Sequence, residues 1–337
     1  MRLEEFDYGL PDERIAQVPV EPRDAARLLV DRGSAPPEHR TVAALAEILR
    51  PGDVVVVNET KVLPARLRLR RASGGAAEVL LLEARSPDRR SWEALVRPGR
   101  KLKVGEILHA TDGPGVISVG ERLPTGDTFE VHLLATGDPL ATLTEVGEMP
   151  LPPYIHTRLA DADRYQTVYA RQPGSAAAPT AGLHLTPAVI DRLAARGVAI
   201  APVELVVGLD TFQPIAAADP LDHRMHSERY LVPPETWAAV EAAERVVAVG
   251  TTSVRALESA AASGSLAGRT ELFLHRGRSF EVVDVLMTNF HLPRTTLLVM
   301  IDAFVGPRWR NLYATALATG YRFLSFGDAM LLDRHAA

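Results

Sequence analysis

Hydrophobic and polar positions along the chain follow two different patterns. Residues 41–49 carry apolar side chains at helical spacing, Pro51-Gly52 ends that pattern, and an unbroken valine run follows over residues 54–57. A continuous apolar run of this kind is typical of a strand that is covered on both faces. The pattern therefore predicts a helix, a turn and a buried strand that belong to an α/β layer.

From about residue 62 to residue 143 the chain changes to short segments in which apolar and polar residues alternate. Glycine and proline interrupt these segments repeatedly, as expected of turns between strands. Short strands at this spacing predict a small antiparallel barrel. Residues 151–154, Leu-Pro-Pro-Tyr, then indicate a stiff linker, because two consecutive prolines continue neither a strand nor a helix.

The α/β pattern returns after this linker. We expect helices at 187–196, 234–245, from Thr252, from about Thr295 and through 311–318, and strands at 198–207, at 246–249 and near Phe323. The fold class predicted is an α/β domain with an inserted small antiparallel β-barrel domain. The predicted boundaries place residues 1–60 and 152–337 in a discontinuous α/β catalytic domain and residues 61–151 in the barrel.

Composition narrows the chemistry. A chain of 337 residues, nearly half of them apolar, suits a globular protein of two domains. It contains no cysteine, which excludes disulfides, thiolate nucleophiles and cysteine-ligated metals. No apolar run approaches the roughly 18 residues of a membrane span, and the first residues lack a secretion signal. We therefore expect a cytoplasmic protein without a membrane partner, and a monomer, because no coiled-coil pattern is present.

The charge is unevenly distributed. The net charge is -5, yet residues 61–110 hold twelve lysines and arginines against five acidic residues, and all three lysines of the chain lie there. A basic barrel face favours contact with RNA phosphates, and a solvated strand face is the alternative interpretation.

Four segments carry candidate chemistry. The first is residues 249–255, in which a buried strand ends in Gly-Thr-Thr-Ser and opens a helix. A helix start with hydroxyl side chains offers a site for a carboxylate, a phosphate or a ribose, although a simple threonine cap is the alternative. No G-x-G-x-x-G follows any strand, which argues against a Rossmann-type methyltransferase or dehydrogenase.

The second segment, residues 179–184, combines small residues with His184 at the end of a long loop over residues 174–182. Such a loop favours ligand approach with an imidazole for proton transfer, and a mobile connector is the alternative.

The third segment, residues 222–228, holds two imidazoles and two carboxylates. General acid–base catalysis or substrate hydrogen bonding is favoured over a metal site, because no third histidine is suitably placed, and a solvated polar loop is the alternative.

The fourth segment, residues 287–293, leads into a helix. Here Asn289 suits a base edge, Phe290 suits stacking and His291 suits proton exchange, a combination that fits a flipped-out nucleobase. Each of the three is also an ordinary core or capping residue.

Together these segments resemble the S-adenosylmethionine:tRNA ribosyltransferase-isomerase family of queuosine biosynthesis. The resemblance covers almost the whole chain and is carried by residues 6–8, 52–58, 64–66, 150–155, 164–170, 178–184, 225–230, 250–259, 288–293 and 325–329. It implies an α/β domain with an inserted barrel. It also implies transfer and isomerisation of the ribosyl part of S-adenosylmethionine onto 7-aminomethyl-7-deazaguanine in the tRNA anticodon, giving epoxyqueuosine-tRNA with release of adenine and methionine. S-adenosylmethionine is then a consumed substrate, and no separate cofactor or metal is expected.

The resemblance and the four segments give the candidate site. The candidate acid–base residues, with no assignment of the base among them, are His184, His226, Glu228 and His291. The candidate substrate-binding residues are Asn58, Thr60, Arg66, Thr180, Ala181, Gly182, Thr251, Thr252, Ser253, Arg255, Asn289 and Phe290. The candidate tRNA-binding residues of the basic segment are Lys61, Arg97, Arg100, Lys101 and Lys103.

The chain departs from the family pattern at four positions. Val207 stands where histidine is expected and Asp210 where glycine is expected, Leu185 replaces a phenylalanine, and Glu59 extends an expected aspartate. The loss of an imidazole removes a proton carrier, and Asp210 adds an anion that suits a cationic donor. Two alternatives follow: a related enzyme that acts on a free nucleoside or small amine, and a non-catalytic RNA-binding paralogue.

Overall fold

The computed structural model describes residues 1–111, 113–124, 127–208 and 214–336. The chain divides into two compact units. Unit 1 contains residues 1–60, 152–172 and 179–337, and unit 2 contains residues 61–151 and 173–178. Within the described ranges, no helix is both long enough and apolar enough to cross a membrane.

Unit 1 is built on a nine-stranded mixed sheet. Its strand order is β16 (Ala267–Thr270), β14 (Glu228–Leu231), β13 (Ala199–Leu205), β3 (Asp53–Asn58), β15 (Arg245–Val249), β17 (Val285–Asn289), β18 (Ala329–Asp333), β1 (Arg27–Val30) and β2 (Glu38–Thr41). The central strands β13, β3, β15 and β17 are parallel, and β18 is antiparallel to β17. All six residues of β3 are buried, as the valine run predicts for a strand covered on both faces.

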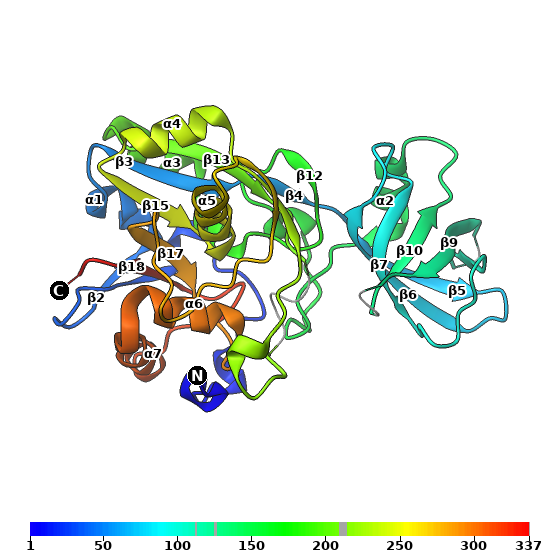
Figure 1. Ribbon diagram of the computed structural model, residues 1–337, viewed down its shortest axis with the longest axis horizontal. Helices are drawn as coiled ribbons and strands as arrows, with labels where there is room; N and C mark the ends of the chain where they lie inside the picture. The colour runs from blue at the N-terminus through cyan, green and yellow to red at the C-terminus, as the bar shows by residue number, and fades with distance from the viewer. Residues whose placement is uncertain (112, 125–126, 209–213, 337) are drawn as a thin grey trace. The chain divides into compact units, whose positions relative to one another are not determined.

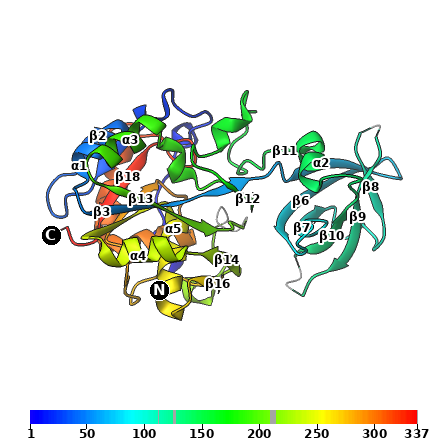
Figure 2. The ribbon, with the colours of Figure 1, turned by 90° about the horizontal axis from the view of Figure 1, so that it is seen from above.

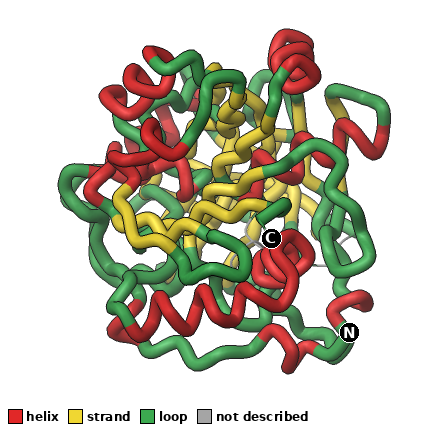
Figure 3. The backbone as a smooth tube through the Cα atoms, turned by 90° about the vertical axis from the view of Figure 1, so that its left-hand side faces the viewer, coloured by secondary structure: helices red, strands yellow, loops and turns green. Residues whose placement is uncertain are grey.

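Helices cover both faces of this sheet. Figure 2 shows α1 (Leu45–Ile48) and α3 (Pro187–Ala195) on one side of β3 and β13, and α4 (Pro234–Ala242) and α5 (Thr251–Ser263) on the other. The helices α6 (Thr296–Val305) and α7 (Trp309–Ala318) complete the unit (Figure 1). Figure 3 shows the strands of the sheet enclosed by helices and loops. The short 3-10 helices are η1 (Leu3–Phe6), η2 (Asp12–Arg14), η3 (Arg23–Ala25), η4 (Val42–Ala44), η5 (Ala162–Tyr165), η6 (Thr180–His184), η8 (Pro220–Asp222) and η9 (Gly306–Arg308).

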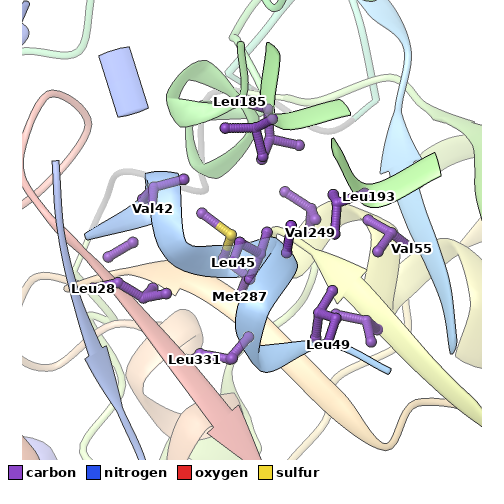
Figure 4. Close-up of a cluster of buried hydrophobic side chains, with 14 of the residues drawn as sticks. Leu28, Val42, Leu45, Leu49, Val55, Leu185, Leu193, Val249, Met287 and Leu331 are labelled. Carbon is purple, nitrogen blue, oxygen red and sulfur yellow. The ribbon is translucent and has the colours of Figure 1, made fainter. Parts of the chain in front are cut away.

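One apolar cluster joins the sheet to α1 and α3. Alternate strand residues such as Val55, Val249 and Met287 point to the side where Leu45 and Leu193 lie (Figure 4). All are almost fully buried. Because successive strand residues point to opposite faces, Val54 and Val56 are directed to the other face, which α4 and α5 cover. The cluster fixes the sheet whose carboxyl edge carries the predicted chemistry.

Unit 2 is a closed antiparallel barrel of six strands. Around the barrel the order is β5 (Arg66–Arg71), β6 (Ala76–Ala84), β7 (Ser91–Arg97), β10 (Phe129–Leu133), β9 (Gly115–Arg122) and β8 (Ile107–His109), and the pairing of β5 with β8 closes it. The alternation in β5 buries Leu67 and Leu69 and exposes Arg68 and Arg70. Helix α2 (Pro139–Val146) and the short strand β11 (Gly147–Glu148) follow, and β4 (Thr60–Val62) pairs with β12 (Gln172–Ser175).

The predicted fold class, an α/β domain with a small antiparallel barrel, is confirmed. Two local expectations are wrong. Phe323 forms only an isolated bridge with Ile15, and the last strand is β18, because the apolar run at 329–332 pairs with both β17 and β1. The segment 174–182 is not an irregular loop, since β12 and η6 occupy its two ends.

We expect Gly147→Ala to destabilise the barrel unit strongly. A Cβ at Gly147 would lie 1.9 Å from the carbonyl oxygen of Pro64 and 2.6 Å from that of Leu143. Both are backbone atoms that cannot rotate away, so the free energy of unfolding should fall by about 3 kcal/mol, the upper end of the usual cost of overpacking. Chemical denaturation of the variant and the parent protein measures this difference in the free energy of unfolding. The control is Gly137→Ala, whose Cβ would meet nothing within 4 Å, and equal stability of the two variants would contradict the packing described here.

Candidate active site

The predicted motifs meet at one edge of the unit 1 sheet. The parallel strands β3, β13, β15 and β17 end there, and β18 begins there, because Asn289 pairs with Ala329 in the antiparallel β17–β18 ladder. In open α/β sheets, ligands bind outside the carboxyl ends of the strands. The segments 180–184, 206–208, 250–255 and 289–291 therefore gather where the fold favours a site.

An open pocket of about 550 Å³ lies at this edge and joins two of the predicted motifs. His226 and Glu228 come from the third sequence segment, and Thr251, Thr252 and Arg255 come from the start of α5. Its remaining lining residues are His223, Met225, Leu272, Phe273, Leu274, Thr296, Leu297 and Met300. We refer to it as the α5 pocket.

Most of the apolar wall of the α5 pocket was not predicted. Residues 272–274 form a short apolar run between polar neighbours. Such a run indicates a buried segment, but it does not show which part of the protein the segment packs against. They lie between β16 and β17 outside any helix or strand, so no periodicity identifies them. Phe273 packs edge-on against His223, with ring centroids 6.3 Å apart.

A buried ion pair forms the polar part of the α5 pocket. The Arg255 guanidinium donates through Nη1 to Glu228 Oε2, and the two side chains are only 7% and 8% exposed. The amide of Gly208 donates to the other carboxylate oxygen, Glu228 Oε1, at 3.0 Å. Burial lowers the pKa of Arg255 to about 10, which leaves it cationic at neutral pH. The pair thus places one positive and one negative charge side by side, and both side chains are largely buried.

Two donors of this pocket have no hydrogen-bond partner among the described residues: Thr252 Oγ1 and Arg255 Nη2. They lie three residues apart on α5 and therefore share a helix face. Gly250, with φ of +85°, provides the turn from β15 into α5, and no side chain caps the helix. The first amide groups of α5 have no acceptor within the helix, so its N-terminus adds further donors at the same place.

His226 is the exposed imidazole of the α5 pocket. Glu228 is committed to Arg255 and Gly208. Of the four predicted acid–base residues, His226 is therefore the one that the geometry leaves best placed to exchange a proton with a ligand in this pocket.

His184 belongs to a different hydrogen-bond network. Asn289 accepts from Thr180 Oγ1 at 2.9 Å, and its Nδ2 faces the Asp328 carbonyl at 3.4 Å and His184 Nε2 at 3.1 Å. Because a carbonyl only accepts, Asn289 Nδ2 is the donor, so His184 Nε2 accepts and its proton lies on Nδ1. Burial, aided by the charges of Arg322 and Arg23, lowers the pKa of His184 to about 4. His184 is therefore a neutral imidazole whose Nε2 already accepts a hydrogen bond, so Nδ1–H is the group that it has left to donate.

His184 also lines a second, partly open pocket. The other lining residues are Pro19, Val20, Arg23, Arg164, Leu183, Ser325 and Phe326. The structure therefore separates His184 from His226 and Glu228, which share the α5 pocket.

The stacking role predicted for Phe290 does not fit the structure. Phe290 is fully buried and packs against Tyr313, Tyr321 and Phe323, with ring centroids 4.6–5.7 Å apart. His291 is buried beside it, with Nε2 3.0 Å from Thr288 Oγ1, and burial lowers its pKa to about 3. Phe290 and His291 therefore belong to the buried core next to the candidate site.

Two predicted ligand-binding side chains are occupied within the protein. The Asn58 side-chain amide donates to the Leu205 carbonyl at 3.0 Å and accepts from the Thr60 and Leu205 amides, which ties β3 to β13. Ser253 is fully buried and donates to the Val249 carbonyl at 2.8 Å. Neither group is free for a ligand, because buried polar groups that already have partners gain little from another.

The remaining small residues shape the edge. Thr60 and Ala181 are buried. Thr180 is half-buried, and its hydroxyl donates a hydrogen bond to the side-chain carbonyl of Asn289. Gly182 is sterically required, since a Cβ there would lie 1.9 Å from the hydroxyl of Tyr169.

The departures from the family pattern have different surroundings. Val207 is buried next to Gly208, the amide that contacts Glu228, and Leu185 belongs to the apolar cluster. Glu59 is half-buried, and burial raises its pKa. Asp210 lies outside the described residues.

The basic residues predicted to bind tRNA lie in unit 2, and all five are exposed: Lys61, Arg97, Arg100, Lys101 and Lys103. Arg66, also in unit 2, is half-buried and donates to the Leu151 carbonyl at 3.4 Å.

Comparison with known proteins identifies the family. The chain matches the model of a family described as queuosine biosynthesis protein over residues 3–332. A relative from Symbiobacterium thermophilum, named S-adenosylmethionine:tRNA ribosyltransferase-isomerase, is 51% identical over 98% of this chain and 100% of its own length. A relative of the same name from Thermus thermophilus is 50% identical over 98% of this chain and 99% of its own length.

A solved structure supports the same conclusion. The crystal structure of S-adenosylmethionine tRNA ribosyltransferase from Thermotoga maritima is 37% identical, covers 97% of this chain and 99% of its own, and superposes with a TM-score of 0.55. The expected family is thereby confirmed: the chain belongs to the S-adenosylmethionine:tRNA ribosyltransferase-isomerase family of queuosine biosynthesis.

Proposed function

We propose that this protein transfers and isomerises the ribosyl moiety of S-adenosylmethionine onto 7-aminomethyl-7-deazaguanine in a tRNA anticodon. The products are epoxyqueuosine-tRNA, adenine and methionine. The observation that carries the proposal is the α5 pocket, in which an exposed imidazole, a buried ion pair, unpartnered donors and an apolar wall converge at the carboxyl edge of the sheet. S-adenosylmethionine has a cationic sulfonium, an amino-acid end and an apolar adenine face to match these groups.

The chemistry requires a proton acceptor near the donor sugar. The sulfonium acidifies the adjacent C5′ hydrogens, so a base that removes one of them promotes the departure of adenine. The acceptor amine then forms a C–N bond to the sugar and releases a proton. A carbon–carbon bond closes the five-carbon ring, and an alkoxide oxygen of the sugar displaces methionine from the sulfonium-bearing carbon, which forms the epoxide and releases methionine as a neutral thioether. We assign the base to His226, because its imidazole is exposed and lines the pocket. The other lining groups hold donor and acceptor in place, which reduces the entropic part of the barrier.

We assign the basic surface residues of the barrel to tRNA phosphates. Replacing Lys101 and Lys103 together by alanine should weaken tRNA binding and reduce the slope of log Kd against log salt concentration by about two, since each neutralised phosphate releases roughly one counterion. Filter binding over a salt series measures the slope. Arg68→Ala is the control, because Arg68 is already paired with Glu148 at 3.0 Å. An unchanged slope in the double variant would remove these lysines from the interface.

The proposed function is tested by adenine release. Purified protein is incubated with S-adenosylmethionine and either tRNA carrying 7-aminomethyl-7-deazaguanine, tRNA carrying guanine at the same position, or the free nucleoside. We expect adenine only with the first. Release with the free nucleoside alone would indicate the small-acceptor enzyme, and tRNA binding without any release would indicate a non-catalytic RNA-binding protein.

A further inference from the structure

The α5 pocket contains two unpartnered hydrogen-bond donors, and a bound anion would supply the acceptors that they lack. Arg255 has three nitrogens: Nε donates to the Leu272 carbonyl at 3.3 Å, Nη1 donates to Glu228, and Nη2 has no acceptor among the described residues. Arg255 is 6% exposed and Thr252 is 8% exposed, so water solvates neither donor well. Buried donors without acceptors are costly, and these two share one helix face and line one pocket, an arrangement that suits an anionic ligand.

The identity of the anion follows from the charges around it. Glu228 lies against Arg255, so a phosphate with two negative charges would meet an opposing carboxylate in the same pocket. A zwitterion instead matches the pair: its carboxylate faces the arginine, and its ammonium faces the glutamate, which retains lone pairs beside its bonds to Arg255 and Gly208.

We propose that Arg255, Thr252 and Glu228 recognise the zwitterionic amino-acid end of S-adenosylmethionine. Arg255 Nη2 and Thr252 Oγ1 donate to the carboxylate, together with the first amides of α5, and Glu228 accepts from the ammonium. This inference rests on the proposed function and extends it, because it makes the amino-acid end the determinant of donor choice. Donors without the carboxylate bind more weakly even though their sulfonium and ribose are intact.

The decisive variant is Thr252→Val. Valine has the shape of threonine, and the hydroxyl that it removes has no partner in the described protein, so the melting temperature should stay equal or rise. The Kd for S-adenosylmethionine should rise about tenfold or more, the effect of losing a hydrogen bond to a charged group. The Kd for decarboxylated S-adenosylmethionine should change less than about twofold, since that donor has no carboxylate to lose.

Ser259→Ala is the matched control. Ser259 lies on the same helix, but its hydroxyl bonds Thr270 Oγ1 at 2.6 Å and does not line the pocket. It should lower the melting temperature and leave both donor affinities unchanged.

Binding is measured by equilibrium dialysis in the presence of tRNA that carries guanine at the acceptor position, which has no amine and prevents turnover. In the parent protein, L-methionine should displace S-adenosylmethionine more effectively than L-methioninol, which lacks the carboxylate. Thr252→Val should abolish that difference. Equal losses for both donors in Thr252→Val, or no loss for either, would overturn the inference, as would equal competition by L-methioninol. A donor that binds with this carboxylate dependence but yields no modified tRNA would instead refute the proposed function alone.

Discussion

Replacing His226 by alanine is expected to lower kcat by about 10²- to 10⁴-fold, the usual contribution of a positioned acid–base group. The side chain is exposed, so the free energy of unfolding should change by no more than about 0.5 kcal/mol. Donor affinity should change little, because the carboxylate-binding groups lie on α5 and not on this segment. Steady-state rates with saturating donor and tRNA, beside equilibrium donor binding, separate the two effects.

The pH profile adds a second readout for His226. His184 and His291, with pKa values of about 4 and about 3, stay neutral between about pH 5 and 8. Neither residue therefore produces a rising or falling limb in a plot of kcat against pH over that range. A limb that is present in the parent protein and absent in His226→Ala therefore belongs to His226. The control is His275→Ala, which removes an imidazole that bonds the Arg276 carbonyl and does not line the pocket. Parent-like rates in His226→Ala would remove His226 from the mechanism.

The largest effect on stability is expected from Glu228→Gln. This change leaves the Arg255 charge buried without its counterion, and breaking a buried pair from one side costs about 3–5 kcal/mol of unfolding free energy. Adding Arg255→Met to the same chain should recover part of that loss, because the uncompensated charge is then gone as well. Denaturation of the two single variants and the double variant gives the coupling energy.

The exposed pair Arg32–Glu38 provides the comparison for this cycle. Its side chains are 45% and 40% exposed, so Glu38→Gln should cost no more than about 1 kcal/mol. Similar costs for Glu228→Gln and Glu38→Gln would show that the Arg255–Glu228 pair is not the dry, coupled unit described here.

The sequence was sufficient to predict the architecture, because the continuous apolar pattern and the alternating pattern each reflect a different kind of strand burial. The valine run at 54–57 is buried on both faces, whereas the barrel strand β5 alternates between buried leucine and exposed arginine. Periodicity reports such local burial directly. It does not report pairing partners, which is why a strand was expected near Phe323 although the ladder forms at 329–333.

The candidate site was predicted only in part, for the same reason. Residues 226–228 and 251–255 were each recognised as chemistry-bearing, but their meeting in one pocket depends on the strand order β14-β13-β3-β15, which no local pattern encodes. The sequence did not decide between stacking and a core role for Phe290, because the rings that bury it come from elsewhere in the chain, including Tyr313 and Phe323. An isolated motif shows the residue types that are available, and tertiary packing decides which of them face a ligand.

The most direct test of the proposed reaction follows the ribose carbons. The protein is incubated with S-adenosylmethionine labelled with ¹³C at all five ribose carbons and with tRNA carrying 7-aminomethyl-7-deazaguanine, and the tRNA is digested for mass spectrometry of its nucleosides. We predict a modified nucleoside that carries the intact five-carbon label, formed in step with free adenine. Recovery of the unmodified nucleoside, or of a product without the label, would contradict the assignment of this chain as a ribosyl transferase.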